Sequence, residues 1–111
     1  MVGFSARLWP SLFLAKRRIK HLAKVRGIPP KFIVQIGAIC IDPKHLALWI
    51  ATDKDWERDQ LLQDSTLAAD CHAALRRSGY PPDAVPHVGI AIESQQTVDR
   101  DCAGSWWHMM K

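Results

Sequence analysis

The side chains best suited to catalysis or metal binding in this chain are five histidines and three cysteines. Histidine exchanges a proton near neutral pH, and an imidazole beside a cysteine can stabilise the nucleophilic thiolate. The spacing contains no HxxxH, HExxH or CxxC frame, so we predict neither a metal site nor a cofactor. The nearest set to a nucleophilic site is Cys102 with His108, which the fold could join to His72 and Asp101. A small enzyme with such a site is the third hypothesis, and a non-enzymatic protein is preferred.

The cysteines also bear on the setting in which the protein works. Their number is odd, and no two have the spacing of a disulfide framework. Cys40 lies in an apolar run and Cys71 on the apolar side of a predicted helix, so both are interpreted as buried small hydrophobes. Reduced thiols are typical of the cytoplasm, which is the predicted location. No apolar run approaches the roughly 18 residues that a membrane span needs.

Tryptophan is unusually frequent, with five residues in a chain of 111. Trp106 and Trp107 are consecutive in residues 105–110, which we predict to be a C-terminal strand. Because side chains alternate across a strand, the two rings should face opposite sides of the sheet. One ring would then need a partner to cover it, and tryptophan is enriched at the centres of protein interfaces. The predicted protein-binding residues are therefore Trp106, Trp107 and His108, and the partner is either another protein or a second copy of the chain.

Charge is distributed unevenly along the chain. Residues 1–41 contain eight Lys or Arg and no acid, whereas residues 42–111 contain seven Lys or Arg and all eleven acids. The formal net charge of +4 therefore combines a strongly basic first part with an acidic remainder. Such a segment is typical of nucleic-acid binding, although a basic helix can equally pack beside acidic parts of its own fold. The predicted phosphate-binding residues, on one face of a helix, are Lys16, Arg17, Lys20 and Lys24.

The element that would carry these basic residues is a helix predicted over residues 10–26. Its apolar residues recur in steps of three and four, as from Leu12 to Ile19, which is the pattern of an amphipathic helix. Pro10 fits the first turn, where its missing N–H costs nothing. Gly27 fits the position after the last turn.

Two β-branched apolar runs, 32–41 and 46–52, predict an antiparallel hairpin. The four residues between them, Asp42-Pro43-Lys44-His45, are typical of a type I turn. Both faces of the first run are mostly apolar, so we predict that it is a central strand covered on both sides.

The rest of the chain alternates between helix and strand. Residues 53–78 predict a helix with a pause at Asp64-Ser65, and residues 87–93 predict a short strand. Ser94 is the predicted cap of a helical turn, which Gly104 ends before the C-terminal strand begins.

These elements predict one domain over residues 1–111, of the α+β class. We expect a single layer of mainly antiparallel sheet, in the order α-β-β-α-β-α-β, with helices packed on it. The order is similar in outline to the second type of KH domain, but residues 53–85 lack the GxxG loop of that domain. In size and build the chain is similar to small bacterial accessory proteins, including immunity proteins that bind and block a toxin. We therefore predict a small protein-binding module, with nucleic-acid binding through the basic helix as the main alternative.

Overall fold

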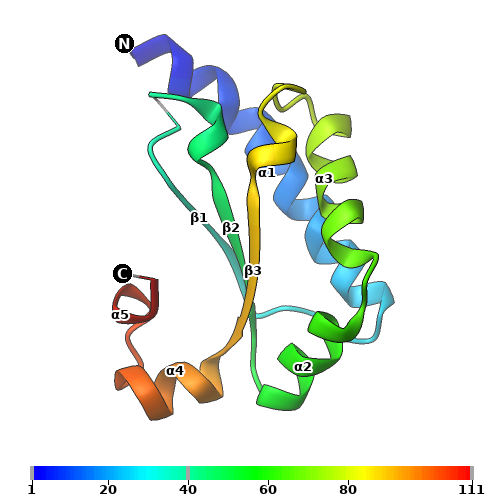
Figure 1. Ribbon diagram of the computed structural model, residues 1–111, viewed down its shortest axis with the longest axis vertical. Helices are drawn as coiled ribbons and strands as arrows, with labels where there is room; N and C mark the ends of the chain where they lie inside the picture. The colour runs from blue at the N-terminus through cyan, green and yellow to red at the C-terminus, as the bar shows by residue number, and fades with distance from the viewer. Residues whose placement is uncertain (1, 40, 111) are drawn as a thin grey trace.

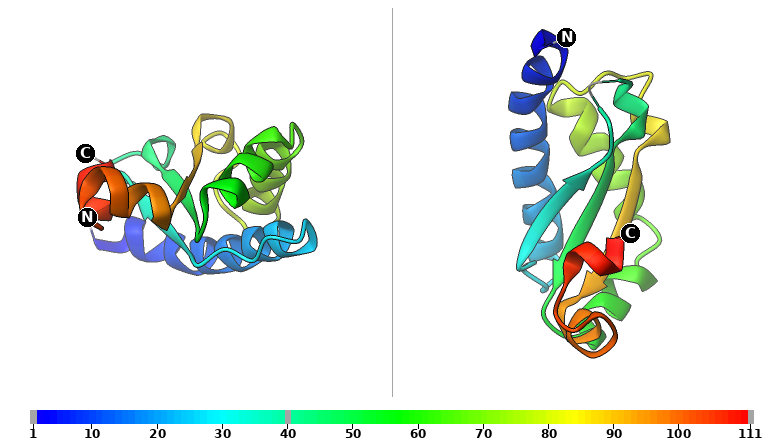
Figure 2. Two further views of the ribbon diagram at one scale, coloured as in Figure 1. Left: turned by 90° about the horizontal axis from the view of Figure 1, so that it is seen from below. Right: turned by 90° about the vertical axis from the view of Figure 1, so that its left-hand side faces the viewer.

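The structure, a computed structural model, describes residues 2–39 and 41–110. It contains one three-stranded sheet, and helices α1 and α3 lie side by side on one face of that sheet (Figures 1 and 2). The predicted class, α+β with one sheet layer and helices packed on it, is confirmed. The elements are α1 (Val2–Val25), β1 (Phe32–Ile36), η1 (Pro43–His45), β2 (Ala47–Thr52), α2 (Asp55–Gln63), α3 (Leu67–Arg77), η2 (Val85–His87), β3 (Gly89–Ser94), α4 (Gln95–Cys102) and α5 (Trp106–Met110).

The strand order is β1-β2-β3, so β2 is the central strand. β1 runs antiparallel to β2 and places Val34 opposite Trp49, which confirms the predicted hairpin. β3 runs parallel to β2 and places Ile90 beside Leu48. The parallel pairing requires a long connection, which α2 and α3 provide. The sheet is therefore mixed, and the prediction that the first strand is central is wrong because β1 lies at an edge.

β1 also ends at Ile36, earlier than the predicted 41. Gly37 follows with φ 119°, and a Cβ there would lie 1.9 Å from the His45 carbonyl oxygen, so glycine is required where the chain leaves the strand. Asp42 then caps η1, its Oδ1 accepting a hydrogen bond from the Lys44 N–H at 2.9 Å. Cys40, which the sequence placed in this strand as a buried hydrophobe, lies outside the described residues.

The helices differ from the prediction mainly at their ends. α1 begins at Val2, so Pro10 lies inside the helix and not in its first turn. The helix predicted over 53–78 is divided into α2 and α3 at the predicted pause. Ser94 caps α4 as predicted, its Oγ accepting from the Thr97 N–H at 3.0 Å. Within the described ranges, no helix is long and apolar enough to cross a bilayer.

The C-terminal segment is a helix, so the strand predicted for residues 105–110 is wrong. Ala103 (φ 52°) and Gly104 (φ 81°) turn the chain after α4. Ser105 then accepts a hydrogen bond from the His108 N–H at 3.3 Å, three residues ahead, as a residue at a helix start does. In a run as short as 105–110, apolar residues fit a strand and a single helical turn equally well, so the cap decides.

The hydrophobic core lies between the sheet and the pair α1 and α3. Along β2, Leu48 and Ile50 are fully buried against these helices. The apolar stripe of α1 faces the same core, and Cys71 and Leu75 close it from α3. One face of the sheet is thus packed like a protein interior, and the other face is more accessible to a partner.

Candidate functional site

The face of the sheet opposite α1 and α3, which we call the open face, is apolar. Because side chains alternate, Trp49, between the buried Leu48 and Ile50, points to this side, as does its partner Val34 on β1. In the described part of the chain, α5 lies at the β1 edge of the open face (Figure 1), and Arg58 of α2 binds Glu93 at its β3 edge at 2.7 Å. The large apolar side chains of the open face are all partly exposed; they are Phe32, Val34, Ile36 and Trp49.

The predicted protein-binding residues flank one corner of the open face. The Trp106 ring meets the Phe32 ring edge-on, with centroids 5.2 Å apart, and its Nε1 donates to the Gln95 Oε1 at 2.8 Å. Trp107 follows in the same helical turn and is 68% exposed, and His108 is exposed beside it. Trp106 is thus packed and Trp107 is exposed, but because α5 is a helix, the prediction that the two rings face opposite sides of the sheet is wrong.

A polar network fixes α4, and through it α5, to the rest of the fold. Asp55, at the start of α2, accepts hydrogen bonds from the Ser94 hydroxyl and from Thr97 Oγ1, the latter at 2.6 Å. Arg100 adds a contact of 3.1 Å to the second carboxylate oxygen. The hydrogen bonds from Ser94 and Thr97, helped by Arg100, hold the pKa of the Asp55 carboxyl well below its usual range. The network lies at the carboxyl ends of the parallel strands β2 and β3, and it positions Trp106 against the sheet.

The predicted phosphate-binding residues do not all share one environment. Lys16 is partly buried and donates from Nζ to Gln35 Oε1 at 2.6 Å, on the sheet side of α1. Arg17, Lys20 and Lys24 are exposed. The structure thus brings three of the four together and assigns Lys16 a packing role.

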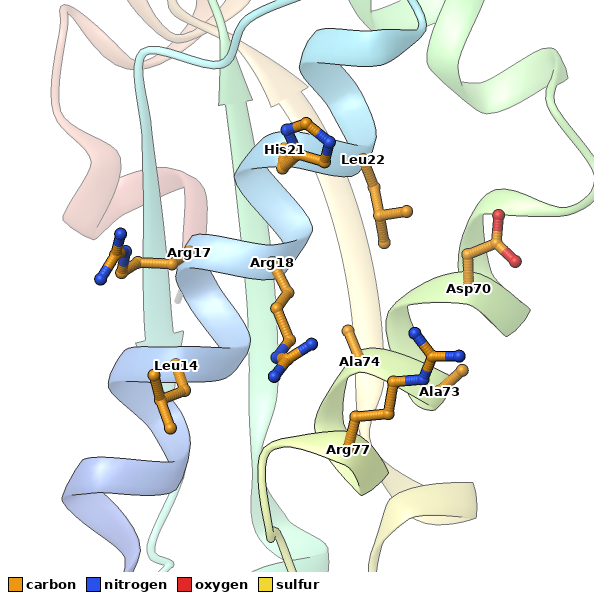
Figure 3. A pocket seen from close by; sticks show the side chains of 9 residues that line it. All are labelled: Leu14, Arg17, Arg18, His21, Leu22, Asp70, Ala73, Ala74 and Arg77. Atoms are coloured by element: carbon orange, nitrogen blue, oxygen red, sulfur yellow. The ribbon is translucent and has the colours of Figure 1, made fainter.

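A depression of about 750 Å³ lies between α1 and α3, and we call it the α1–α3 groove (Figure 3). Arg18 and Arg77 lie at its opposite walls, one from each helix. Sequence reasoning missed both residues as members of one site. Arg18 is four residues from both Leu14 and Leu22, and this helical spacing could have predicted that the three share one side of α1. No pattern in the neighbouring sequence indicates that Arg77 belongs to the same site. The full lining is Leu14, Arg17, Arg18, His21, Leu22, Asp70, Ala73, Ala74 and Arg77.

The acids nearest the basic helix are engaged with a single arginine. Arg26 Nε donates to Asp64 Oδ2 and its Nη2 donates to Asp70 Oδ2, both at 2.6 Å. The Thr66 hydroxyl and Arg26 lower the pKa of Asp64 to about 2. This cluster ties the end of α1 to the α2–α3 junction. Among the residues that the structure describes, Asp64 and Asp70 form no ion pair with the cations earlier in α1, such as Arg17 and Arg18.

The cysteine and histidine hypothesis gains no support from the geometry. Cys71 is buried in the core, and burial raises the pKa of its thiol to about 12, so it is protonated at neutral pH. The His72 Nε2 lies 2.9 Å from the Val88 carbonyl oxygen, a contact that joins α3 to the segment before β3. Within residues 2–39 and 41–110, no hydrogen bond joins Cys102 to His108, and no cluster of histidine, cysteine or acid could hold a metal ion.

No protein-family model, curated protein or solved structure matches this chain. The candidate function therefore rests on the two surfaces themselves: the apolar open face and the basic α1–α3 groove.

Proposed function

We propose that the chain is a non-enzymatic protein-binding module whose interface is the open face together with Trp106, Trp107 and His108. The observation that carries this proposal is the unequal cover of the two faces of the sheet. Leu48 and Ile50 are fully buried on one side, whereas Trp49, between them, is partly exposed on the other. Contiguous apolar surface of this kind is typical of protein contact sites.

The geometry suits recognition by a partner protein better than capture of a small molecule. A sheet face is broad and flat, and the described pockets lie on the helix side and not here. Trp106 is held by Phe32 and Gln95 before any partner arrives, so its ring loses little freedom on binding. Trp107 extends this anchor outward and would insert into the partner. An immunity-type role, in which the module blocks its partner by covering it, is one form of this function.

Site-specific crosslinking in cells tests the interface without knowing the partner. A photoreactive residue placed at Val34 or Ile36 should crosslink to one defined protein, or to a second copy of the chain. The matched control position is Trp56 on α2, which is 60% exposed and is not one of the open-face residues. Equal crosslinking from Trp56, or none from the open face, would overturn the proposal.

Once the crosslinked protein is purified, calorimetry measures the contribution of the exposed ring. Trp107→Ala should weaken binding by about 2 kcal/mol or more, because anchoring aromatics dominate interface energies. Trp56→Ala removes a ring of similar exposure and should leave the affinity unchanged. Sedimentation velocity of the isolated chain separates the two partner classes. If the partner is a second copy, the isolated chain sediments as a dimer or larger species; if the partner is a different protein, it sediments as a monomer.

A further inference from the structure

The α1–α3 groove presents cations on two walls that face a common space. Arg18 comes from α1 and Arg77 from α3, and both side chains lie over the gap between the helices (Figure 3). Its floor is apolar, with Leu22 and Ala74. Two guanidinium groups across one gap repel each other, so an anion held between them is stabilised by both.

The one acid in the lining does not neutralise these cations. Asp70 is paired with Arg26 at 2.6 Å, and Arg26 also binds Asp64. No ion pair within the described ranges involves Arg17, Arg18 or Arg77. The groove therefore keeps a positive potential that an external anion can satisfy.

The cations continue beyond the groove. A second depression, of about 430 Å³, is lined by Arg17, Lys20, His21, Lys24 and Pro29, and shares Arg17 and His21 with the first. The two depressions together form a continuous basic track across the outer side of α1. Such a track is longer than one phosphate group and suits a polymer that repeats its charge along its length.

We propose that this track binds the phosphate backbone of a single-stranded nucleic acid. The cations line open depressions on the surface of a packed helix pair, and a flexible single strand can follow them more closely than a stiff duplex can. Phe13 is 62% exposed one turn before Arg17, whose guanidinium lies 5.9 Å from the ring centroid. Exposed aromatic rings beside arginines are the usual platforms on which unpaired bases stack. This surface lies on the opposite side of the sheet from the proposed protein interface and is independent of it.

Fluorescence anisotropy with labelled oligonucleotides of about 15 nucleotides tests the proposal on the full chain. The probes are oligo(dT), oligo(U) and a DNA duplex of the same length. Single strands should bind more tightly than the duplex, and affinity should fall steeply between about 50 and 200 mM salt. The arms with DNA and RNA show which sugar the site prefers.

A double variant in the groove and a single control variant outside it localise the binding. Arg18→Gln combined with Arg77→Gln should weaken binding about tenfold or more and make the salt dependence shallower, because each phosphate contact contributes to the slope. Arg76→Gln is the control: it removes one charge next to Arg77 on the exposed side of α3, outside the groove lining, and should change affinity less than twofold. All three residues are at the surface, so circular dichroism and melting should confirm an unchanged fold.

Three results would overturn the proposal. They are the absence of single-strand binding at low salt, duplex binding as tight as single-strand binding, and loss of affinity in Arg76→Gln equal to that in the double variant. Competition by polyglutamate as effective as by oligonucleotide would assign the track to an acidic protein segment instead. Binding of the chain to phosphatidylserine vesicles but not to oligonucleotides would assign it to a lipid surface.

Discussion

The two faces of the sheet are built from the same strands but meet different surroundings. On one face, Leu48 and Ile50 are fully buried under α1 and α3. On the other, Val34 and Trp49 stand opposite each other across β1 and β2 and are partly exposed. Both sets are apolar, so composition does not distinguish them. The difference shows that a strand's alternation defines which residues share a face, whereas the helices decide which face becomes core.

The largest expected effect compares one residue from each face. Leu48→Ala should lower the free energy of unfolding by about 2–5 kcal/mol, because it leaves a cavity in a fully packed site. Val34→Ala should cost about 1 kcal/mol or less, since its side chain is already in partial contact with water. Urea unfolding of both variants measures the difference. Equal losses would mean that the open face is packed as tightly as the covered one.

Acid should weaken two polar clusters, one that ties the end of α1 to the α2–α3 junction and one that fixes α4 to α2. Asp64 and Asp55 have pKa values in the folded chain below the ordinary value of 3.8, Asp64 at about 2. Their stabilising contribution is therefore complete above pH 3.8 and is lost as the pH falls through the folded values. The melting temperature should fall between pH 4 and pH 2, and Asp64→Asn should show a smaller fall. A melting temperature that stays constant over this range would contradict the assigned contacts.

A smaller effect is expected at Trp106, the ring that α5 places on the open face. Trp106→Ala removes the edge contact with Phe32 and the hydrogen bond to Gln95. We expect a loss of about 1–3 kcal/mol in the free energy of unfolding, from an aromatic pair and one hydrogen bond. Chemical denaturation measures this loss, and Phe32→Leu provides a partner variant that keeps the hydrogen bond. No loss in Trp106→Ala would show that α5 does not pack on the sheet in solution.

The smallest effect on stability is expected at Trp107. Its ring is 68% exposed, so Trp107→Ala should change the free energy of unfolding by less than about 0.5 kcal/mol. The same variant should have its main effect on partner binding. Differential scanning calorimetry checks the stability, and a loss as large as that of Trp106→Ala would reassign Trp107 to the folded core.

Local patterns predicted the elements that depend on neighbouring residues. The apolar stripe of α1, the turn at Asp42 and the cap at Ser94 all act within a few residues, and all three are present in the structure. The break at Asp64 between α2 and α3 was predicted in the same way. A cap or a turn satisfies backbone groups within its own segment, so its signal can be read from the sequence.

Tertiary structure alone decided the features on which the two candidate surfaces depend. β1 became an edge strand because β3 pairs with the other side of β2. That pairing joins residues about forty positions apart in the sequence, as Ala47 and Gly89 are. The groove exists because α1 packs beside α3 and brings Arg18 to Arg77, which no local pattern relates. The C-terminal residues formed a helix, and their predicted strand failed, because a run of four apolar residues and one histidine fits either period until a cap and a contact with Phe32 decide between them. Contacts between distant segments offset the entropy lost on loop closure only when the whole core forms. The pattern of a short stretch of sequence therefore cannot predict them.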